Sequence, residues 1–370
     1  MIKKITVTLI FFLLFSFTVC AEENNTYSEQ FKNSGADSLY DSLPDSAKEF
    51  FRKNNIDPSD YNWTSSLSGE NVFSHIWDFI HSGSAAPLKS GAAILGIILI
   101  TAAITSFVKE SGAMTAAVYA SVITVCAVAV TPIFSCISTC VNALKGSSVF
   151  MLSFIPVFAA IIAASGGAVT SGIMSSILLL VSEAVSYISA FVITPLMGGY
   201  LAVSISSSVS PLLNQTGIAE GIKKISMWIF SLVTTVFLGV LGIQTTVGNA
   251  ADSLSLRTAR FILGSAIPVA GTAVSEAFAT VTASMQMLKA SVGVYGVVAV
   301  AVIFLPLLLE LILWRIALLV NYCAADIFSL TKISAVLKAA DMMLSLLIGI
   351  ILLIAVVFII SLTVVISVGK

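Results

Sequence analysis

Charged and metal-binding side chains are scarce in this chain. Only 10% of its 370 residues are charged, and its two histidines, His75 and His81, are spaced so that they do not share one helical face. The five cysteines include no Cys-x-x-Cys pair, so neither a metal site nor a cofactor is predicted. The sequence also lacks a phosphate-binding loop and a nucleophile-base pair at catalytic spacing, which argues against an enzyme.

Apolar side chains, in contrast, are abundant. They make up 58% of the residues, and the mean hydropathy is +1.03. A soluble core of this length could not hide so much apolar surface, so the composition predicts an integral membrane protein. The net charge of -1 averages an aqueous part and a membrane part, which have to be considered separately.

Residues 1–21 have the pattern of a secretory signal peptide. Lys3 and Lys4 precede a short apolar core, and Val19-Cys20-Ala21 matches a cleavage site. The bulky Val19 argues against a lipoprotein with a lipid on Cys20. An uncleaved anchor is the remaining alternative, although the apolar core is shorter than the ~20 residues of a spanning helix. In either case the chain from residue 22 is expected to be exported.

Residues 22–87 are expected to form an exported acidic N-terminal segment. They contain 11 acidic and four basic residues, a net charge of -7, which agrees with the rule that basic residues stay on the cytoplasmic side. Pro44 and the Asn54-Asn55 pair predict a short helix between them. This helix is too small to hold its own core, so we expect it to pack on the membrane domain or on a partner; a loosely ordered tail is the alternative.

Residues 88–370 are expected to form a multi-helix membrane domain. Seven apolar segments are about long enough to span a bilayer, namely 91–108, 114–134, 149–164, 172–193, 228–246, 292–319 and 342–368. A serine-rich eighth candidate, 195–213, would place Lys223 and Lys224 on the cytoplasmic side, as the positive-inside rule favours. The predicted fold class is therefore an all-α polytopic membrane protein with a bundle of seven or eight transmembrane helices. Runs of small residues favour a compact bundle or a homo-oligomer.

A polar segment, residues 242–277, interrupts the apolar pattern. Its charged and helix-weakening residues are Asp252, Arg257, Arg260, Gly264, Pro268, Gly271 and Glu276. A charge at the bilayer centre costs about 2.5–3.5 kcal/mol, and a proline removes a backbone donor. One interpretation is a loop and an interfacial helix with its arginines at the headgroups. The other is a broken or re-entrant helix, which a membrane tolerates only where the backbone is buried in protein or faces a cavity.

Glu183, Glu310 and Arg315 are isolated ionisable residues within the predicted spans. Glu310 and Arg315 are five residues apart, roughly 140° around a helix, so each is expected to pair with another helix rather than with its neighbour. A proton or ion relay through Glu183 or Glu310 is the functional interpretation. A structural pair or a charge at headgroup level is the alternative.

The polar segment also resembles a known family. The matching residues are Gly242-Ile243-Gln244, Asp252, Leu256-Arg257, Ala259-Arg260-Phe261, Ile267-Pro268-Val269 and Gly271. This pattern resembles the stage III sporulation protein AE family, which has a larger aliphatic residue where Ala270 stands and often an aspartate near Glu276. The resemblance extends over most of the chain, and no catalytic motif comes with it.

The resemblance implies a membrane subunit of the sporulation transenvelope channel or secretion-like complex, in the mother-cell membrane around the forespore and needed for forespore development after engulfment. The implied partners are the other stage III sporulation A operon proteins, the lipid bilayer and, indirectly, the forespore stage II sporulation protein Q, with no nucleic acid. On this hypothesis residues 22–87 face the space between the membranes, and residues 242–277 line or gate a conduit. The alternative is an autonomous small-solute permease that uses Glu183, Glu310 or Arg257 and transports without partners.

Overall fold

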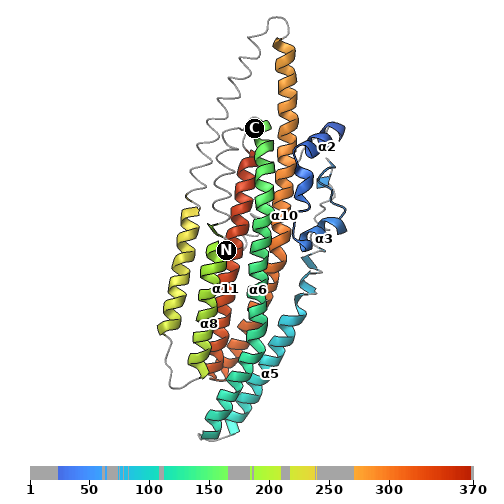
Figure 1. Cartoon of the computed structure of the whole chain (residues 1–370). Coiled ribbons are helices and arrows are strands. Elements are labelled where there is room, and N and C mark those ends of the chain that lie inside the picture. Colours follow the sequence, from blue (N-terminus) through green and yellow to red (C-terminus); the bar gives the residue numbers. More distant parts are fainter. Residues whose placement is uncertain are drawn as a thin grey trace.

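The computed structural model describes residues 24–60, 63–64, 83–107, 112–165, 187–209, 217–237 and 271–367, together with isolated positions between 74 and 81 and at 184, 185 and 239. All regular elements within these residues are helices (Figure 1), which agrees with the predicted all-α class. The predicted signal peptide, Glu183 and residues 242–270 of the polar segment lie outside the described residues.

Three short elements come first: α2 (Asn24–Asn33), the 3-10 helix η1 (Ala36–Leu39) and α3 (Asp45–Lys53). The helix predicted between Pro44 and Asn54 is confirmed as α3. Pro44 is its N-cap, with a φ of -58° that suits the entry to a helix. Asn54 is the C-cap, and Asn55 follows with a φ of 51°, a left-handed conformation that asparagine tolerates better than most residues.

Long helices make up the rest of the described chain. They are α5 (Ala85–Phe107), α6 (Gly112–Ala164), α8 (Thr194–Val209) preceded by the π-turn η3 (Ser189–Ile193), an unlabelled helix at 217–237, α10 (Gly271–Ile327) and α11 (Thr331–Ser367). Among the described residues, five helices are long and apolar enough to cross a membrane. The chain therefore has the character of a multi-pass membrane protein. The serine-rich candidate span 195–213 overlaps α8, which is one of these five helices.

The structure corrects one part of the predicted topology. Segments 114–134 and 149–164, predicted as two separate crossings, belong to the single helix α6. Polar residues between them do not end the helix, and two of their hydroxyls bond to carbonyls of the same helix. Thr139 Oγ1 donates to the Ser135 carbonyl at 3.0 Å, and Ser147 Oγ donates to the Leu144 carbonyl at 2.8 Å. The prediction of two separate crossings at this place is therefore wrong.

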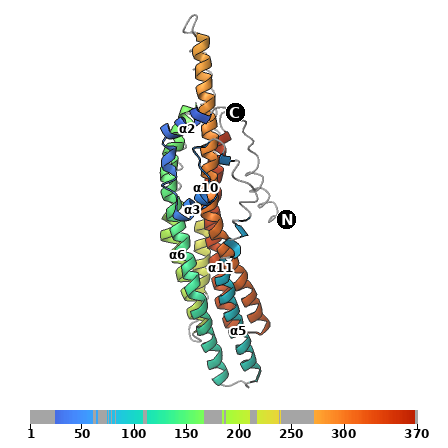
Figure 2. The same cartoon turned by 90° about the vertical axis from the view of Figure 1, so that its right-hand side faces the viewer.

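The long helices run roughly along one direction (Figures 1 and 2). α5 ends and α6 begins toward the same end of the bundle as the turn from α10 to α11, and helix 217–237 begins at the end where α8 finishes. The short N-terminal elements lie beside α10 and α6, farther toward the opposite end.

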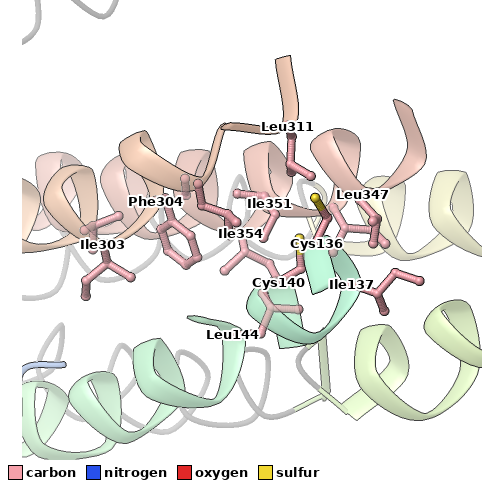
Figure 3. Close-up of a cluster of buried hydrophobic side chains, with 14 of the residues drawn as sticks. Cys136, Ile137, Cys140, Leu144, Ile303, Phe304, Leu311, Leu347, Ile351 and Ile354 are labelled. Carbon is pink, nitrogen blue, oxygen red and sulfur yellow. The ribbon is translucent and has the colours of Figure 1, made fainter. Parts of the chain in front are cut away.

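The core forms where α6, α10 and α11 meet. Cys136 and Cys140 point into it, among Leu311, Leu347 and Ile354 (Figure 3). Both cysteines are free and buried, so they act as small apolar residues of the core.

Candidate functional site

The N-terminal unit, defined here as residues 24–60 and 63–64, is docked on the long helices. Its buried apolar side chains are Tyr27, Phe31, Leu39, Leu43, Phe50, Phe51, Ile56 and Trp63. They belong to the same apolar cluster as the side chains of α6 and α10. The expectation that this segment packs on the membrane domain is therefore confirmed.

One serine of α10 joins the two ends of the N-terminal unit. Trp63 Nε1 donates to Ser291 Oγ at 2.9 Å, and Ser291 Oγ lies 2.7 Å from the Tyr27 hydroxyl. The Tyr27 hydroxyl donates to the Pro58 carbonyl at 3.0 Å. One arrangement uses each hydrogen once: the Trp63 N–H to Ser291, the Ser291 O–H to Tyr27, and the Tyr27 O–H to Pro58. Such a chain of hydrogen bonds strengthens its members through mutual polarisation.

Ring contacts and a second serine add to this docking. The centre of the Tyr295 ring on α10 lies 5.0 Å from the centre of the Phe51 ring and 6.2 Å from that of the Trp63 ring. Tyr295 and Trp63 meet edge-on, an arrangement that aromatic pairs favour. Gln30 Nε2 donates to Ser284 Oγ at 2.7 Å. Residues 284–295 of α10 thus form one continuous docking strip.

The N-terminal unit also touches α6. A Cβ atom added to Gly146 would lie 3.2 Å from Pro44 Cγ, and one added to Gly35 would lie 3.9 Å from Val157 Cγ2. Gly35 itself has a φ of 75°, which glycine adopts without strain. The unit is therefore held against both α6 and α10.

The outer surface of the unit is charged. Its exposed ionisable residues are Glu29, Lys32, Asp37, Asp41, Asp45, Glu49, Arg52, Lys53, Asp57 and Asp60. Seven of these ten side chains are acidic, so the unit presents a negative surface on the side away from the helices.

Arg315 pairs with another helix, as expected. Its Nε lies 2.8 Å from Asp341 Oδ1, and its Nη2 lies 3.2 Å from Asp341 Oδ2, so α10 and α11 are joined by a bidentate ion pair. Sequence analysis did not single out Asp341, or the buried Lys289 of α10, although each is an ionisable residue in an apolar run.

Further basic residues lie where α10 and α11 join. Lys338 Nζ is 2.8 Å from Asp326 Oδ2. Lys332 bonds to the Tyr119 hydroxyl and lies 4.0 Å from the centre of its ring, a cation-π contact that ties this end of α11 to α6.

The other predicted site residues are not brought together in the described part of the chain. Glu310 lies half-buried on α10, within electrostatic reach of Cys136 and Cys140, and makes no ion pair with another described residue. Gly271 and Glu276 belong to the first two turns of α10. Predicted residues outside the described ranges are Glu183, Asp252, Arg257, Arg260 and Pro268. Within those ranges, no group of three or more histidine, cysteine or acidic residues could hold a metal ion.

Comparison with known proteins identifies the family. The family described as Stage III sporulation protein AE matches residues 62–369, most of the chain. The chain belongs to this family. A curated member, Stage III sporulation protein AE of Bacillus subtilis (strain 168), is 31% identical over 156 residues, which are 42% of this chain and 39% of that relative. The alignment thus spans well under half of the relative.

No solved structure matches this Stage III sporulation protein AE family member. The family match begins at residue 62, so it includes the docking strip on α10 and Trp63, whereas residues 24–60 of the N-terminal unit precede it.

Proposed function

We propose that this chain is a membrane subunit of a channel or secretion-like complex that links mother cell and forespore, and that it is needed for forespore development after engulfment. Membership of the Stage III sporulation protein AE family implies a role in sporulation, and the match over residues 62–369 is the observation that carries the proposal. The proposed partners are the other stage III sporulation A operon proteins and, indirectly, the forespore stage II sporulation protein Q.

The arrangement of the helices supports a subunit with a fixed shape. Arg315 and Asp341 neutralise each other across α10 and α11, so this arginine has a structural partner within the chain. The N-terminal unit is fixed to α10 through Ser291 and Tyr295, and it presents its acidic surface outward. Such a surface suits contacts with other proteins of the complex in the space between the two membranes.

The distribution of basic residues supports an orientation. Lys332 and Lys338 lie at the start of α11, and Lys223 and Lys224 lie at the start of helix 217–237. Both helices begin toward the end of the bundle that is away from the N-terminal unit (Figure 1). Since basic residues stay in the cytoplasm, we propose that this end is cytoplasmic and that the mature N-terminus is on the exported side.

The polar segment remains a candidate for the conduit. We propose that Asp252, Arg257 and Arg260 line or gate it, because charged residues in a membrane domain usually face protein or water. Neutral replacements at these three positions are expected to block assembly of the complex or sporulation. Wild-type assembly and wild-type spore counts in that triple variant would exclude the role.

Two measurements separate this function from an autonomous permease. The full chain, isolated from sporulating cells, is expected to bring the other operon proteins with it. The same chain, purified and placed alone in lipid vesicles, is expected to move no solute, since a channel subunit needs its partners. Saturable uptake of a small solute by these vesicles, lost on replacement of Glu310 by glutamine, would favour the permease.

A further inference from the structure

α6 and α10 are much longer than a membrane is thick. They contain 53 and 57 residues, which at 1.5 Å per residue corresponds to about 80 and 86 Å. A bilayer is about 45 Å thick with its headgroups, and a tilt of about 40° lengthens the path through it to only about 60 Å. Part of each helix therefore lies outside the bilayer.

The N-terminal unit indicates which part this is. It packs against residues 284–295 of α10 and against Gly146 and Val157 of α6. Ten exposed charged side chains cover its outer surface, and such side chains are too costly to place in hydrocarbon. The unit must lie in water, and the parts of α6 and α10 that it touches lie beside it at the same level.

The outward face of α6 changes at a definite place. Its exposed side chains between Gly112 and Phe134 are glycine, alanine, threonine, isoleucine and phenylalanine. The next exposed positions on this face include Ser135, Ser138, Asn142 and Lys145, which recur every three or four residues and so form one polar stripe, and the exposed Val149 and Leu152 follow it. The change from apolar to polar side chains marks a boundary near Ser135.

α5 lies beside the first half of α6. It has 23 residues and a length of about 34 Å, and the apolar helical stretch that contains it runs over 79–107, 29 residues or about 44 Å. It runs antiparallel to α6, and Thr101 Oγ1 bonds to Ser121 Oγ at 2.7 Å. Counting from this contact, the first residue of α5, Ala85, lies 16 positions away and falls beside residue 137 of α6. Ala85 is thus level with the start of the polar stripe, and helical residues at 79–81 and 83 precede it.

We propose that α6 leaves the hydrocarbon near Ser135, and that its remaining length forms, with residues 284–295 of α10, a helical rod outside the membrane with the N-terminal unit on its side. The part of α6 beyond Ser135 is about 43 Å long. Segment 149–164 is then part of this rod and not a membrane span: its buried side chains pack inside the rod, and Val149 and Leu152 lie on its exposed face. The side on which the rod projects follows from the proposed orientation; the rod itself does not depend on the sporulation role.

Thiol labelling of single-cysteine variants tests the rod. The full chain is produced in cells that lack the other sporulation proteins, with all five native cysteines replaced by alanine, namely Cys20, Cys126, Cys136, Cys140 and Cys323. Single cysteines are then placed by Val149→Cys and Leu152→Cys on the rod. Ile123→Cys is the matched control on the same helix: residues 149, 152 and 123 are exposed to 56%, 50% and 54%. Ser38→Cys on the N-terminal unit is the control for a site in water.

A membrane-impermeant maleimide is added to intact protoplasts and then to opened ones. We expect the cysteines at 149 and 152 to react in intact protoplasts at least about tenfold faster than the cysteine at 123, because the reactive thiolate forms in water and not in hydrocarbon. If both react only after opening, the rod stands and the proposed orientation is wrong. If both stay as slow as position 123 before and after opening, this half of α6 is in the hydrocarbon and the inference is overturned.

Discussion

The Ser291 hydroxyl offers the sharpest test of how the N-terminal unit is held. In a Ser291→Ala variant, the Trp63 N–H loses its acceptor while Trp63 is only 2% exposed. A buried donor without a partner costs about 1–3 kcal/mol, and the lost bond to Tyr27 adds about 0.5–1.5 kcal/mol. Tyr27 keeps its bond to the Pro58 carbonyl, so its hydroxyl stays partly satisfied. The two losses add to about 1.5–4.5 kcal/mol, and a value of about 2 kcal/mol, near the lower end, makes undocking of the unit roughly 30-fold more favourable.

Trypsin cleavage after Arg52 and Lys53 measures this undocking. Both residues are in the last turn of α3, and a protease reaches a helix only when it opens. Cleavage of the purified full chain in detergent is expected to be about 30-fold faster in the Ser291→Ala variant than in wild type. Ser138→Ala, on the exposed face of α6, is the matched control and should leave the rate unchanged. Equal cleavage rates for Ser291→Ala and wild type would refute the role given to the hydrogen-bond chain.

Three further tests, with four substitutions, probe the packing of the long helices through the thermal stability of the purified chain. Gly296→Ala should lower the Tm although alanine favours helices, because the added Cβ would lie 2.6 Å from the fully buried ring of Phe154. Such overpacking costs about 1–3 kcal/mol. A raised Tm would contradict this close approach of the two helices. Asp341→Ala should destabilise by up to about 1 kcal/mol, because it leaves Arg315, a side chain that is 37% exposed, without its partner. Arg315→Met in the same chain should recover most of the loss, and no recovery would argue against the pair. Tyr295→Phe should leave the Tm unchanged or raise it, since this buried hydroxyl has no hydrogen-bond partner among the described residues, and a clear loss would indicate a partner.

Local signals in the sequence predict the short elements well. The proline at 44 and the asparagines at 54 and 55 mark the start and end of α3, because proline suits a helix start and asparagine tolerates a left-handed turn. The fourfold spacing of Cys136 and Cys140 likewise predicts their shared buried face. These predictions succeed because they depend on neighbouring residues alone.

Hydropathy predicted the number and limits of the long helices less well than local signals predicted the short elements. The polar residues between 135 and 148 lower the local hydropathy as a loop would, yet they continue the helix and place several polar side chains outward. An apolar run such as 149–164 cannot reveal whether lipid or protein covers it, because both environments favour the same side chains.

The contacts of the candidate site could not be predicted from neighbouring residues in the sequence, for a different reason. Tyr27 and Ser291 are separated by 264 positions, and Arg315 and Asp341 by 26, so each pair depends on how whole helices pack. The sequence indicated that Arg315 needed a partner on another helix, because an unpaired charge in a membrane domain is costly. It gave no means of choosing Asp341.

Deletion of the gene in the spore-forming organism that encodes it tests the proposed function most directly. Vegetative growth and the stage at which spore formation stops are scored together, and the wild-type gene supplied elsewhere serves as the control. The account predicts normal growth, engulfment of the forespore and then arrest of its development. Normal spores from the deletion strain, or a nutrient-dependent growth defect without sporulation arrest, would contradict it.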